Sequence, residues 1–250
     1  MILLIDAGNT RIKWRIITPA SPHPVAENAC SHNQTEHLAA IFTTYPDIRR
    51  IIGTNVAGTS IRDTINQLSS AYALTPEWII AAPQHNRLHN LYANPAQLGS
   101  DRWAALIGAH SLHTHACLVV TAGTATTIDL INDSGTFLGG LILPGIELMK
   151  RALSVNTAQL SLLEGEFCTT PRNTADAIHS GCLFAQAGAI EKMFGQIAHL
   201  PHALCLLSGG AASTFSHLLS IPFRQVNNLV LDGLAVISGT SAHLPPSLTP

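Results

Sequence analysis

Short apolar runs alternate with amphipathic segments along most of the chain. The first run, Ile2–Ile5, leads through a Gly/Asn turn into an alternating segment at 11–17, and this pattern predicts a β-hairpin. A second apolar run at 117–120, a turn of small residues and a run at 128–131 predict another hairpin. Further strands are expected at 49–54, 77–81, 136–143, 203–207 and 226–231, and helices at 34–43, 61–71, 101–110 (with Ser100 as N-cap), 146–155, 174–198, 211–219 and from Asp232 onward. Strands that alternate with helices predict an α/β protein.

The two predicted hairpins share a turn pattern, in which Ala and Gly follow the end of an apolar strand. The turns are Asp6-Ala-Gly-Asn-Thr10 and Thr121-Ala-Gly-Thr-Ala-Thr-Thr127, which start 115 residues apart. Glycine lets the backbone approach a ligand closely, and neighbouring hydroxyl and amide groups can bind phosphate oxygens. One such turn alone is typical of an ordinary hairpin. Two matching turns, neither with a Walker A or G-x-G-x-x-G pattern, favour two similar halves that meet at a phosphate-binding cleft.

Charged residues near these turns are candidates for chemistry. Lys13 follows the first turn, where it would either contact a phosphate or lie on a solvated strand face. In the segment Tyr92–Arg102, Gly99 and Ser100 place Asp101 and Arg102 at a predicted helix start. Asp101 can accept a proton from a substrate hydroxyl there, and Arg102 can bind a substrate carboxylate. Spacing alone favours the simpler alternative, in which Asp101 complements the helix dipole and Arg102 is solvated.

Composition narrows the class of protein. Of 250 residues, 46% are hydrophobic and 11% are charged, which excludes a largely disordered chain. A net charge of −2 argues against a dedicated nucleic-acid-binding protein, which needs a basic surface. Gly, Pro or polar residues interrupt every apolar run, so no membrane span is expected, and the start of the chain lacks the basic region of a signal peptide. These features predict a cytoplasmic protein.

Cysteine and histidine do not indicate a metal site. The five cysteines form no C-x-x-C pair, and Cys117 and Cys205 lie in apolar runs, so we expect reduced thiols in the core. The 13 histidines match no zinc signature, and His113 and His115 are expected at the polar surface. The sequence contains no G-x-S-x-G motif, which argues against a serine hydrolase.

Together the motifs resemble the type III pantothenate kinases, in particular the branch known as the Bvg accessory factor family, along nearly the whole chain. The matching segments are Asp6-Ala-Gly-Asn-Thr-Arg-Ile-Lys13, Asn94-Pro-x-x-Leu-Gly-Ser-Asp-Arg102, Thr121-Ala-Gly-Thr-Ala-Thr-Thr127, Gly139-Gly-Leu-Ile-Leu-Pro-Gly145, Asn173-Thr174 with Ala177-Ile-x-Ser-Gly181, and Ser208-Gly-Gly210. The resemblance implies the ribonuclease H-like fold of the sugar kinase, heat-shock ATPase and actin superfamily, with ATP bound between two related α/β halves. We expect these halves at 1–115, with the first phosphate loop and the substrate segment, and at 116–250, with the second phosphate loop.

The resemblance also implies an activity, the ATP-dependent phosphorylation of pantothenate to 4'-phosphopantothenate, which is the first step of coenzyme A biosynthesis. It implies ATP with Mg²⁺ as the phosphoryl donor, a homodimer, and no nucleic-acid or membrane partner. By this resemblance, Asp101 is the catalytic proton acceptor, and Asp6 binds magnesium through water. The resemblance assigns ATP binding to Asp6, Ala7, Gly8, Asn9, Thr10, Arg11, Ile12, Lys13 and Thr124, and pantothenate binding to Tyr92, Gly99, Ser100, Asp101, Arg102 and Thr174.

One position departs from the family pattern. Many relatives have Asp at the position of Thr121, where it binds a monovalent cation such as K⁺, and the neutral hydroxyl of Thr121 argues against such a site here. A requirement for K⁺ or NH₄⁺ stays open. Two alternatives to the kinase also stay open: an accessory protein that keeps the nucleotide cleft without efficient catalysis, and a kinase of another small hydroxyl compound.

Overall fold

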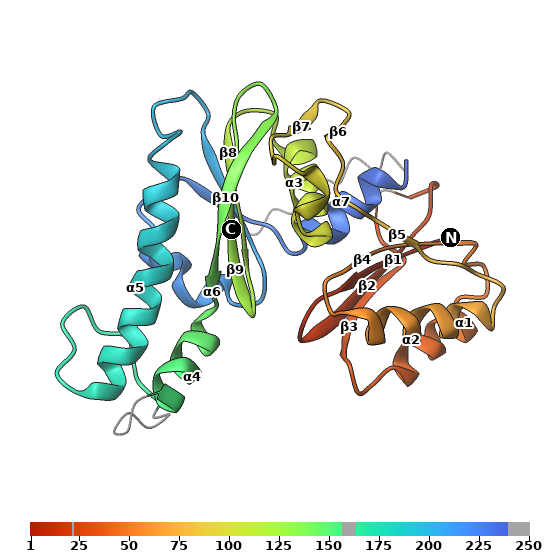
Figure 1. The fold of residues 1–250 in the computed structure, drawn as a ribbon, viewed down its shortest axis with the longest axis horizontal. Helices are drawn as coiled ribbons and strands as arrows, with labels where there is room; N and C mark the ends of the chain where they lie inside the picture. The colour runs from red at the N-terminus through yellow and green to blue at the C-terminus, as the bar shows by residue number, and fades with distance from the viewer. Residues whose placement is uncertain (22, 157–163, 240–250) are drawn as a thin grey trace. The chain divides into compact units, whose positions relative to one another are not determined.

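A computed structural model describes residues 1–21, 23–156 and 164–239 (Figure 1). Its contacts divide the chain into two compact units. The first contains Met1–Thr114, Gly135–Phe137 and the segment that begins at Asn228. The second contains His115–Ser134 and Leu138–Asn227. Each unit therefore combines segments that are distant in sequence.

The first unit contains seven strands, four α-helices and one 3₁₀ helix within the described residues. Its elements are β1 (Ile2–Ala7), β2 (Arg11–Ile17), β3 (Ala26–Ser31), α1 (Glu36–Thr44), β4 (Arg50–Asn55), α2 (Thr59–Ser70), β5 (Glu77–Trp78), β6 (Gln84–His85), β7 (Leu88–Asn90), the 3₁₀ helix η1 (Pro95–Gln97), α3 (Ser100–Leu112) and α7 (Leu229–Ile237). The second unit contains β8 (Cys117–Ala122), β9 (Ala125–Ile131), α4 (Ile146–Asn156), α5 (Thr174–Phe194), β11 (Leu204–Ser208), α6 (Ala212–Phe215), the 3₁₀ helix η2 (Ser216–Leu218) and β12 (Phe223–Gln225). Strand β10 (Thr136–Pro144) starts in the first unit, where Thr136 and Phe137 pair with β7, and continues in the second.

The sheet of the first unit has the strand order β3-β2-β1-β4-β5. Strand β1 pairs antiparallel with β2 and parallel with β4. Leu3, Leu4 and Ile5 of β1 are at most 1% exposed, as expected for a central strand that is covered on both faces. Helices α1 and α2 lie together along this sheet in Figure 1, and their apolar residues Leu38 and Ile65 belong to the same buried core as Leu3 and Ile5.

Helices α3 and α7 of the first unit cross at close range. A Cβ atom on Gly233 of α7 would overlap the carbonyl oxygen of Ala104, and one on Gly108 of α3 would lie 2.8 Å from the Gly233 nitrogen. These glycines let the two backbones meet directly. The crossing places α3, whose first turn carries Asp101, against a helix from the end of the described chain.

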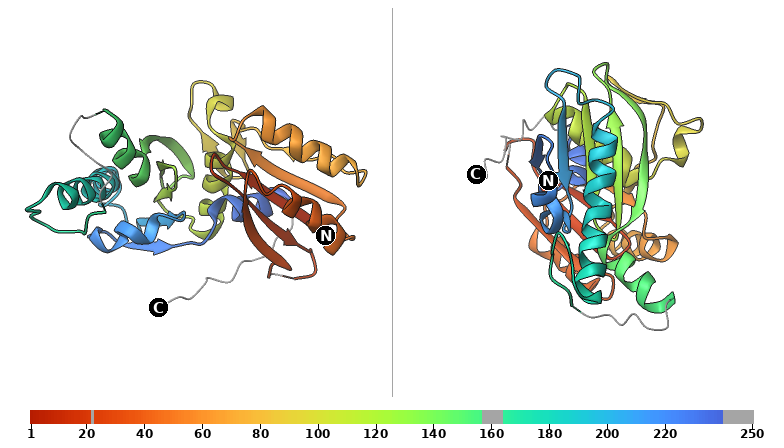
Figure 2. Two further views of the ribbon diagram at one scale, coloured as in Figure 1. Left: turned by 90° about the horizontal axis from the view of Figure 1, so that it is seen from below. Right: turned by 90° about the vertical axis from the view of Figure 1, so that its left-hand side faces the viewer.

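The sheet of the second unit repeats this arrangement. Its strands have the order β12-β11-β8-β9-β10 within a seven-stranded sheet that continues through β7 and β6, and β8 pairs antiparallel with β9 and parallel with β11. The order β10-β9-β8-β11-β12 therefore corresponds strand by strand to β3-β2-β1-β4-β5. Figure 2 shows the long helix α5 running along this sheet, and Leu183 and Ile190 of α5 share a core with Leu118 and Val120 of β8.

Most predicted strands and helices are confirmed, with three corrections. The strand predicted at 226–231 is wrong: α7 begins at Leu229 rather than Asp232, because the Asn228 side chain caps it by accepting a hydrogen bond from the Leu231 amide at 3.3 Å. The N-cap of α3 is Gly99, and Ser100 is instead the first helical residue. Strands β3, β6, β7 and β12 were not predicted.

The predicted core cysteines are confirmed. Cys117 and Cys205 are completely buried, and burial raises the pKa of each thiol to about 12. Within the described ranges, no helix combines the length and apolar character that crossing a bilayer requires.

Candidate active site

The first glycine turn connects β1 to β2 and carries a buried carboxylate at its start. Asp6 lies opposite Lys13 in the antiparallel pair β1–β2 and opposite Thr54 in the parallel pair β1–β4. Directly paired residues project from the same face of a sheet, so the three side chains share one face. The hydroxyl of Thr54 donates a hydrogen bond to Asp6 Oδ1 at 3.1 Å.

The electrostatic environment of Asp6 is unusual for a carboxylate. Asp6 is only 6% exposed, and this burial raises its pKa from 3.8 to about 6. The positive charge of Lys13 and the Thr54 hydrogen bond lower this pKa, whereas the negative charge of Asp101 raises it. The charges of Lys13 and Asp101 thus both act on Asp6, although Asp101 lies on a different element.

Asp101 lies in the first turn of α3, close to the end of β4. Its Oδ1 accepts a hydrogen bond from the Arg102 amide at 2.8 Å, and burial raises the pKa of this carboxyl group. Ser100 Oγ accepts a hydrogen bond from the amide of Asn55 at 3.3 Å, which links the helix start to β4. Gly99 leaves the necessary space, because a Cβ there would lie 2.7 Å from Asp101 Oδ1.

Arg102 is held by Tyr92 rather than by solvent. Its Nη1 donates a hydrogen bond to the Tyr92 hydroxyl at 3.1 Å, and its guanidinium carbon lies 5.7 Å from the centre of that ring. The Tyr92 ring in turn packs at 5.4 Å from the ring of Phe137. Arg102 is only 6% exposed, so the solvated alternative for this residue is wrong.

The sequence-predicted residues of the first unit thus form one neighbourhood, which extends from the first turn to the start of α3. Thr54 belongs to it but was not a candidate. The signal that could have found it is its place near the carboxyl end of the predicted strand 49–54, since the ends of neighbouring parallel strands meet at one edge of a sheet.

The residues of the neighbourhood fit a magnesium ion that is also bound by phosphate groups. The negative charge of the half-buried Asp101 raises the pKa of the buried Asp6, and a divalent cation would relieve this repulsion. Among the described residues, no group of three or more His, Cys, Asp or Glu side chains converges as a protein-only metal site. Magnesium in nucleotide enzymes commonly has one or two carboxylate contacts and completes its shell with water and phosphate.

The second glycine turn lies in the second unit, where backbone groups of two glycine-containing segments contact it. Thr121 of β8 pairs with Thr127 of β9 and with Ser208 of β11. The amide of Gly145 donates to the carbonyl of Thr124 at 2.9 Å. Gly209 has a φ of +99°, and a Cβ there would overlap the carbonyl oxygen of Ala122. The Pro-Gly and Ser-Gly-Gly segments therefore contain glycine because their backbones support this turn.

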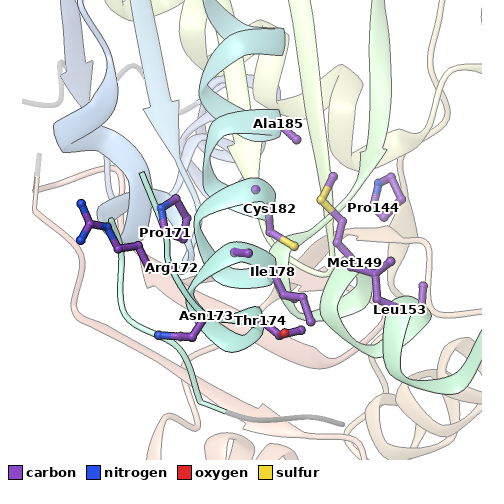
Figure 3. Close-up of a pocket in the computed structure, with 13 residues that line it drawn as sticks. Pro144, Met149, Leu153, Pro171, Arg172, Asn173, Thr174, Ile178, Cys182 and Ala185 are labelled. Atoms are coloured by element: carbon purple, nitrogen blue, oxygen red, sulfur yellow. The ribbon is translucent and has the colours of Figure 1, made fainter. Parts of the chain in front are cut away.

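Thr174 lies at the start of α5, beside a cavity of about 990 Å³ between α4 and α5 (Figure 3). Its neighbour Asn173 caps the helix by accepting a hydrogen bond from the Asp176 amide at 2.9 Å. Figure 3 shows apolar side chains, including Met149 and Ile178, along the cavity wall beyond this polar end. Thr121, Thr124 and Thr174 all belong to the second unit, whereas the residues around Asp6 belong to the first.

Comparisons with solved structures support the fold. A conserved protein from Campylobacter jejuni, described as a Baf family transcriptional activator, matches with a TM-score of 0.62 and 21% identity over 95% of this chain and 98% of its own. A protein from Sinorhizobium meliloti, described as a 2-dehydro-3-deoxygalactonokinase, matches with a TM-score of 0.59 and 13% identity over 95% of this chain and 98% of its own. At these identities the likeness concerns the fold alone, and it confirms the expected α/β fold of sugar kinases and actin-like ATPases.

Comparisons with sequences are more specific. The family model for type III pantothenate kinase matches residues 2–196. A type III pantothenate kinase from Aromatoleum aromaticum is 57% identical over 97% of this chain and 99% of its own length. Another from an Azoarcus species is 51% identical over 100% of this chain and 95% of its own. The chain therefore belongs to the type III pantothenate kinase family.

Proposed function

We propose that this protein transfers the γ-phosphoryl group of ATP to the hydroxyl of pantothenate, the first step of coenzyme A biosynthesis. Membership of the family supports the reaction. The observation that carries the proposal is the neighbourhood of Asp6, Lys13 and Asp101, which gathers one cation, one buried carboxylate and one half-buried carboxylate beside a glycine turn. Phosphoryl transfer depends mainly on positioning and charge neutralisation, and these groups can provide both.

ATP would be held by Asp6–Lys13 of the first turn and by Thr124 of the second. Lys13 supplies a positive charge on the same sheet face as Asp6, which suits a phosphate group. Asp6 would hold magnesium through a water molecule. When bound, magnesium would neutralise charge that develops on the transferred phosphoryl group. The contiguous halves 1–115 and 116–250 remain part of this proposal, because each contains one copy of the strand order and one turn.

Pantothenate would be bound by Tyr92, Gly99, Ser100, Arg102 and Thr174. The buried guanidinium of Arg102, already oriented by Tyr92, suits the carboxylate of pantothenate. Asp101 would accept the proton of the attacking hydroxyl. Because burial raises its pKa, Asp101 is a stronger base than an exposed carboxylate.

A homodimer in the cytoplasm completes the proposal. Large apolar side chains on the second unit are exposed in the single chain and would be covered in a dimer. They include Leu141, Ile142, Leu148, Leu153, Val155 and Phe184. The five cysteines are unpaired, which suits a reducing compartment. We do not assign a K⁺ or NH₄⁺ site to Thr121, whose side chain carries no charge.

The experiment is a coupled assay of ADP release with and without pantothenate, in the presence of Mg²⁺ and of Na⁺, K⁺ or NH₄⁺. We expect pantothenate-dependent release that Asp101→Asn reduces by about 10²- to 10⁴-fold, the usual contribution of a general base. Asp63→Asn, at an exposed position on α2, is the matched control and should retain full activity. Absence of pantothenate-dependent release with every cation would refute the kinase proposal, and normal turnover of Asp101→Asn would refute the role of Asp101.

A further inference from the structure

The imidazole of His32 contacts the first glycine turn from the residue that follows β3. Its Nε2 lies 2.8 Å from the carbonyl oxygen of Gly8. A carbonyl oxygen only accepts hydrogen bonds, so Nε2 must carry a proton and donate it. His32 is half-buried and lies 24 residues from Gly8 in sequence, so this contact depends on the tertiary fold.

A short ordered turn keeps His32 in place. Ser31, the last residue of β3, pairs with Arg11 at the start of β2. The Ser31 hydroxyl donates to Gln34 Oε1 at 2.8 Å, and the Gln34 amide donates to the Ser31 carbonyl at 3.0 Å. The imidazole is therefore attached to a chain segment whose position is set by the same sheet that forms the glycine turn.

The contact has a consequence for the next amide group. The Gly8 carbonyl and the Asn9 N–H belong to one planar trans peptide, so the two groups point in opposite directions. Holding the Gly8 carbonyl against His32 therefore makes the Asn9 N–H face away from the imidazole. Asn9 is exposed, and within the described part of the chain no other backbone group accepts a hydrogen bond from its amide.

We propose that His32 is a positioning residue for the first turn, which fixes the Gly8–Asn9 peptide so that the Asn9 amide can donate to a phosphate oxygen of the bound nucleotide. This inference rests on the proposed function of the turn as part of an ATP site. His32 itself would not touch the nucleotide. Backbone amides with a fixed direction bind phosphate without the entropy cost of ordering the turn on binding.

Two substitutions at the same position test the donor role. The side-chain amide nitrogen of Gln can take the place of histidine Nε2, whereas that of Asn is one methylene group too short to reach Gly8. His37→Asn, at an exposed position on α1, is the matched control. Affinity for a non-hydrolysable ATP analogue with Mg²⁺ would be measured by calorimetry on the full-length protein, together with KM, kcat and the thermal midpoint.

We expect His32→Asn to weaken binding of the analogue and to raise KM for ATP by about 3- to 10-fold, the range for one lost hydrogen bond. His32→Gln and His37→Asn should both stay close to the wild-type values, and KM for pantothenate should not change in any variant. Wild-type affinity in His32→Asn would overturn the inference. Equal losses in His32→Gln and His32→Asn would also overturn it, since donation by Nε2 would then not matter. A wild-type protein that binds the analogue but does not phosphorylate pantothenate would refute the proposed substrate and leave this inference standing.

Discussion

The buried charge of Asp6 is expected to lower the free energy of unfolding, and the substitution Asp6→Asn tests this. Below pH 3.8 the carboxyl group is protonated in both the folded and the unfolded chain. Between pH 3.8 and about 6, the unfolded chain releases this proton while the folded chain retains it, so stability falls as the pH rises. Above about pH 6 both states are ionised and the full cost of the buried charge remains.

The magnitude follows from the same two values. The difference between 3.8 and about 6 corresponds to about 3 kcal/mol, at about 1.4 kcal/mol for each pH unit. Asn has nearly the same shape as Asp and no charge, and its side-chain oxygen can still accept the hydrogen bond from Thr54. Asp6→Asn should therefore increase the free energy of unfolding by up to about 3 kcal/mol at pH 7.5 and by much less at pH 4.

The assay is urea unfolding at pH 4, 5.5 and 7.5, without nucleotide or magnesium, so that no ligand stabilises either variant. Asp63→Asn provides the control for removal of an exposed negative charge and should change stability by less than about 0.5 kcal/mol. A stability gain of Asp6→Asn that does not depend on pH would contradict the reasoning, because it would show that the buried charge is not its source. A loss of stability at pH 7.5 would do the same.

Three further predictions concern the first unit. Arg15 binds Asp232 at 2.6 Å in a buried ion pair, so Arg15→Met should lower the free energy of unfolding by about 3–5 kcal/mol in urea titrations, and adding Asp232→Leu should restore much of it. Tyr92→Phe removes the hydroxyl that accepts from Arg102 and should raise KM for pantothenate by about 3- to 10-fold in steady-state kinetics; an unchanged KM would contradict this role. Because burial raises the pKa of Asp101, the acid limb of the kcat/KM profile should lie above pH 3.8, and a limb at or below that value would contradict its role as the base.

The parts of the fold that could be predicted from the sequence are those with strong local patterns. The hairpin of β1 and β2 combines a buried apolar run with a Gly/Asn turn, and both features are local. Strand β3 has the sequence AENACS and one buried residue, Cys30, so neither alternation nor an apolar run marks it. The run Leu229-Val230-Leu231 is buried on all sides, and such a run does not distinguish a helix from a strand.

The same limit applies to the candidate site. Asp6, Lys13, Asp101 and Arg102 could be selected because they lie in short motifs with a recognisable turn or helix start. Thr54 was not selected: its place at the end of a predicted strand was a weak signal, and its contact with Asp6 depends on the parallel register of β1 and β4, which are 48 residues apart at this point. The burial of Arg102 could not be predicted from the sequence either, because it depends on packing against Tyr92.

The repeated sheet order explains how two similar turns can have different chemistry. At matching positions, the first turn has Asp6 opposite Lys13, whereas the second has Thr121 opposite Thr127. The parallel neighbour carries a hydroxyl in both cases, on Thr54 in the first unit and on Ser208 in the second.

The second turn is also shorter, with three residues between the paired Ala122 and Thr126 and four between the paired Ala7 and Ile12. Charged groups at the equivalent strand positions thus occur in the first unit, and neutral hydroxyls occur in the second. Under the proposed phosphoryl transfer, charge neutralisation and magnesium would belong to the first turn, and neutral hydrogen bonds to phosphate oxygens would belong to the second. A negative side chain at Thr121 would alter that division, so Thr121→Asp should create a dependence of KM for ATP on K⁺ that the wild-type protein shows more weakly or not at all. An identical K⁺ dependence in both proteins would show that position 121 does not control cation binding.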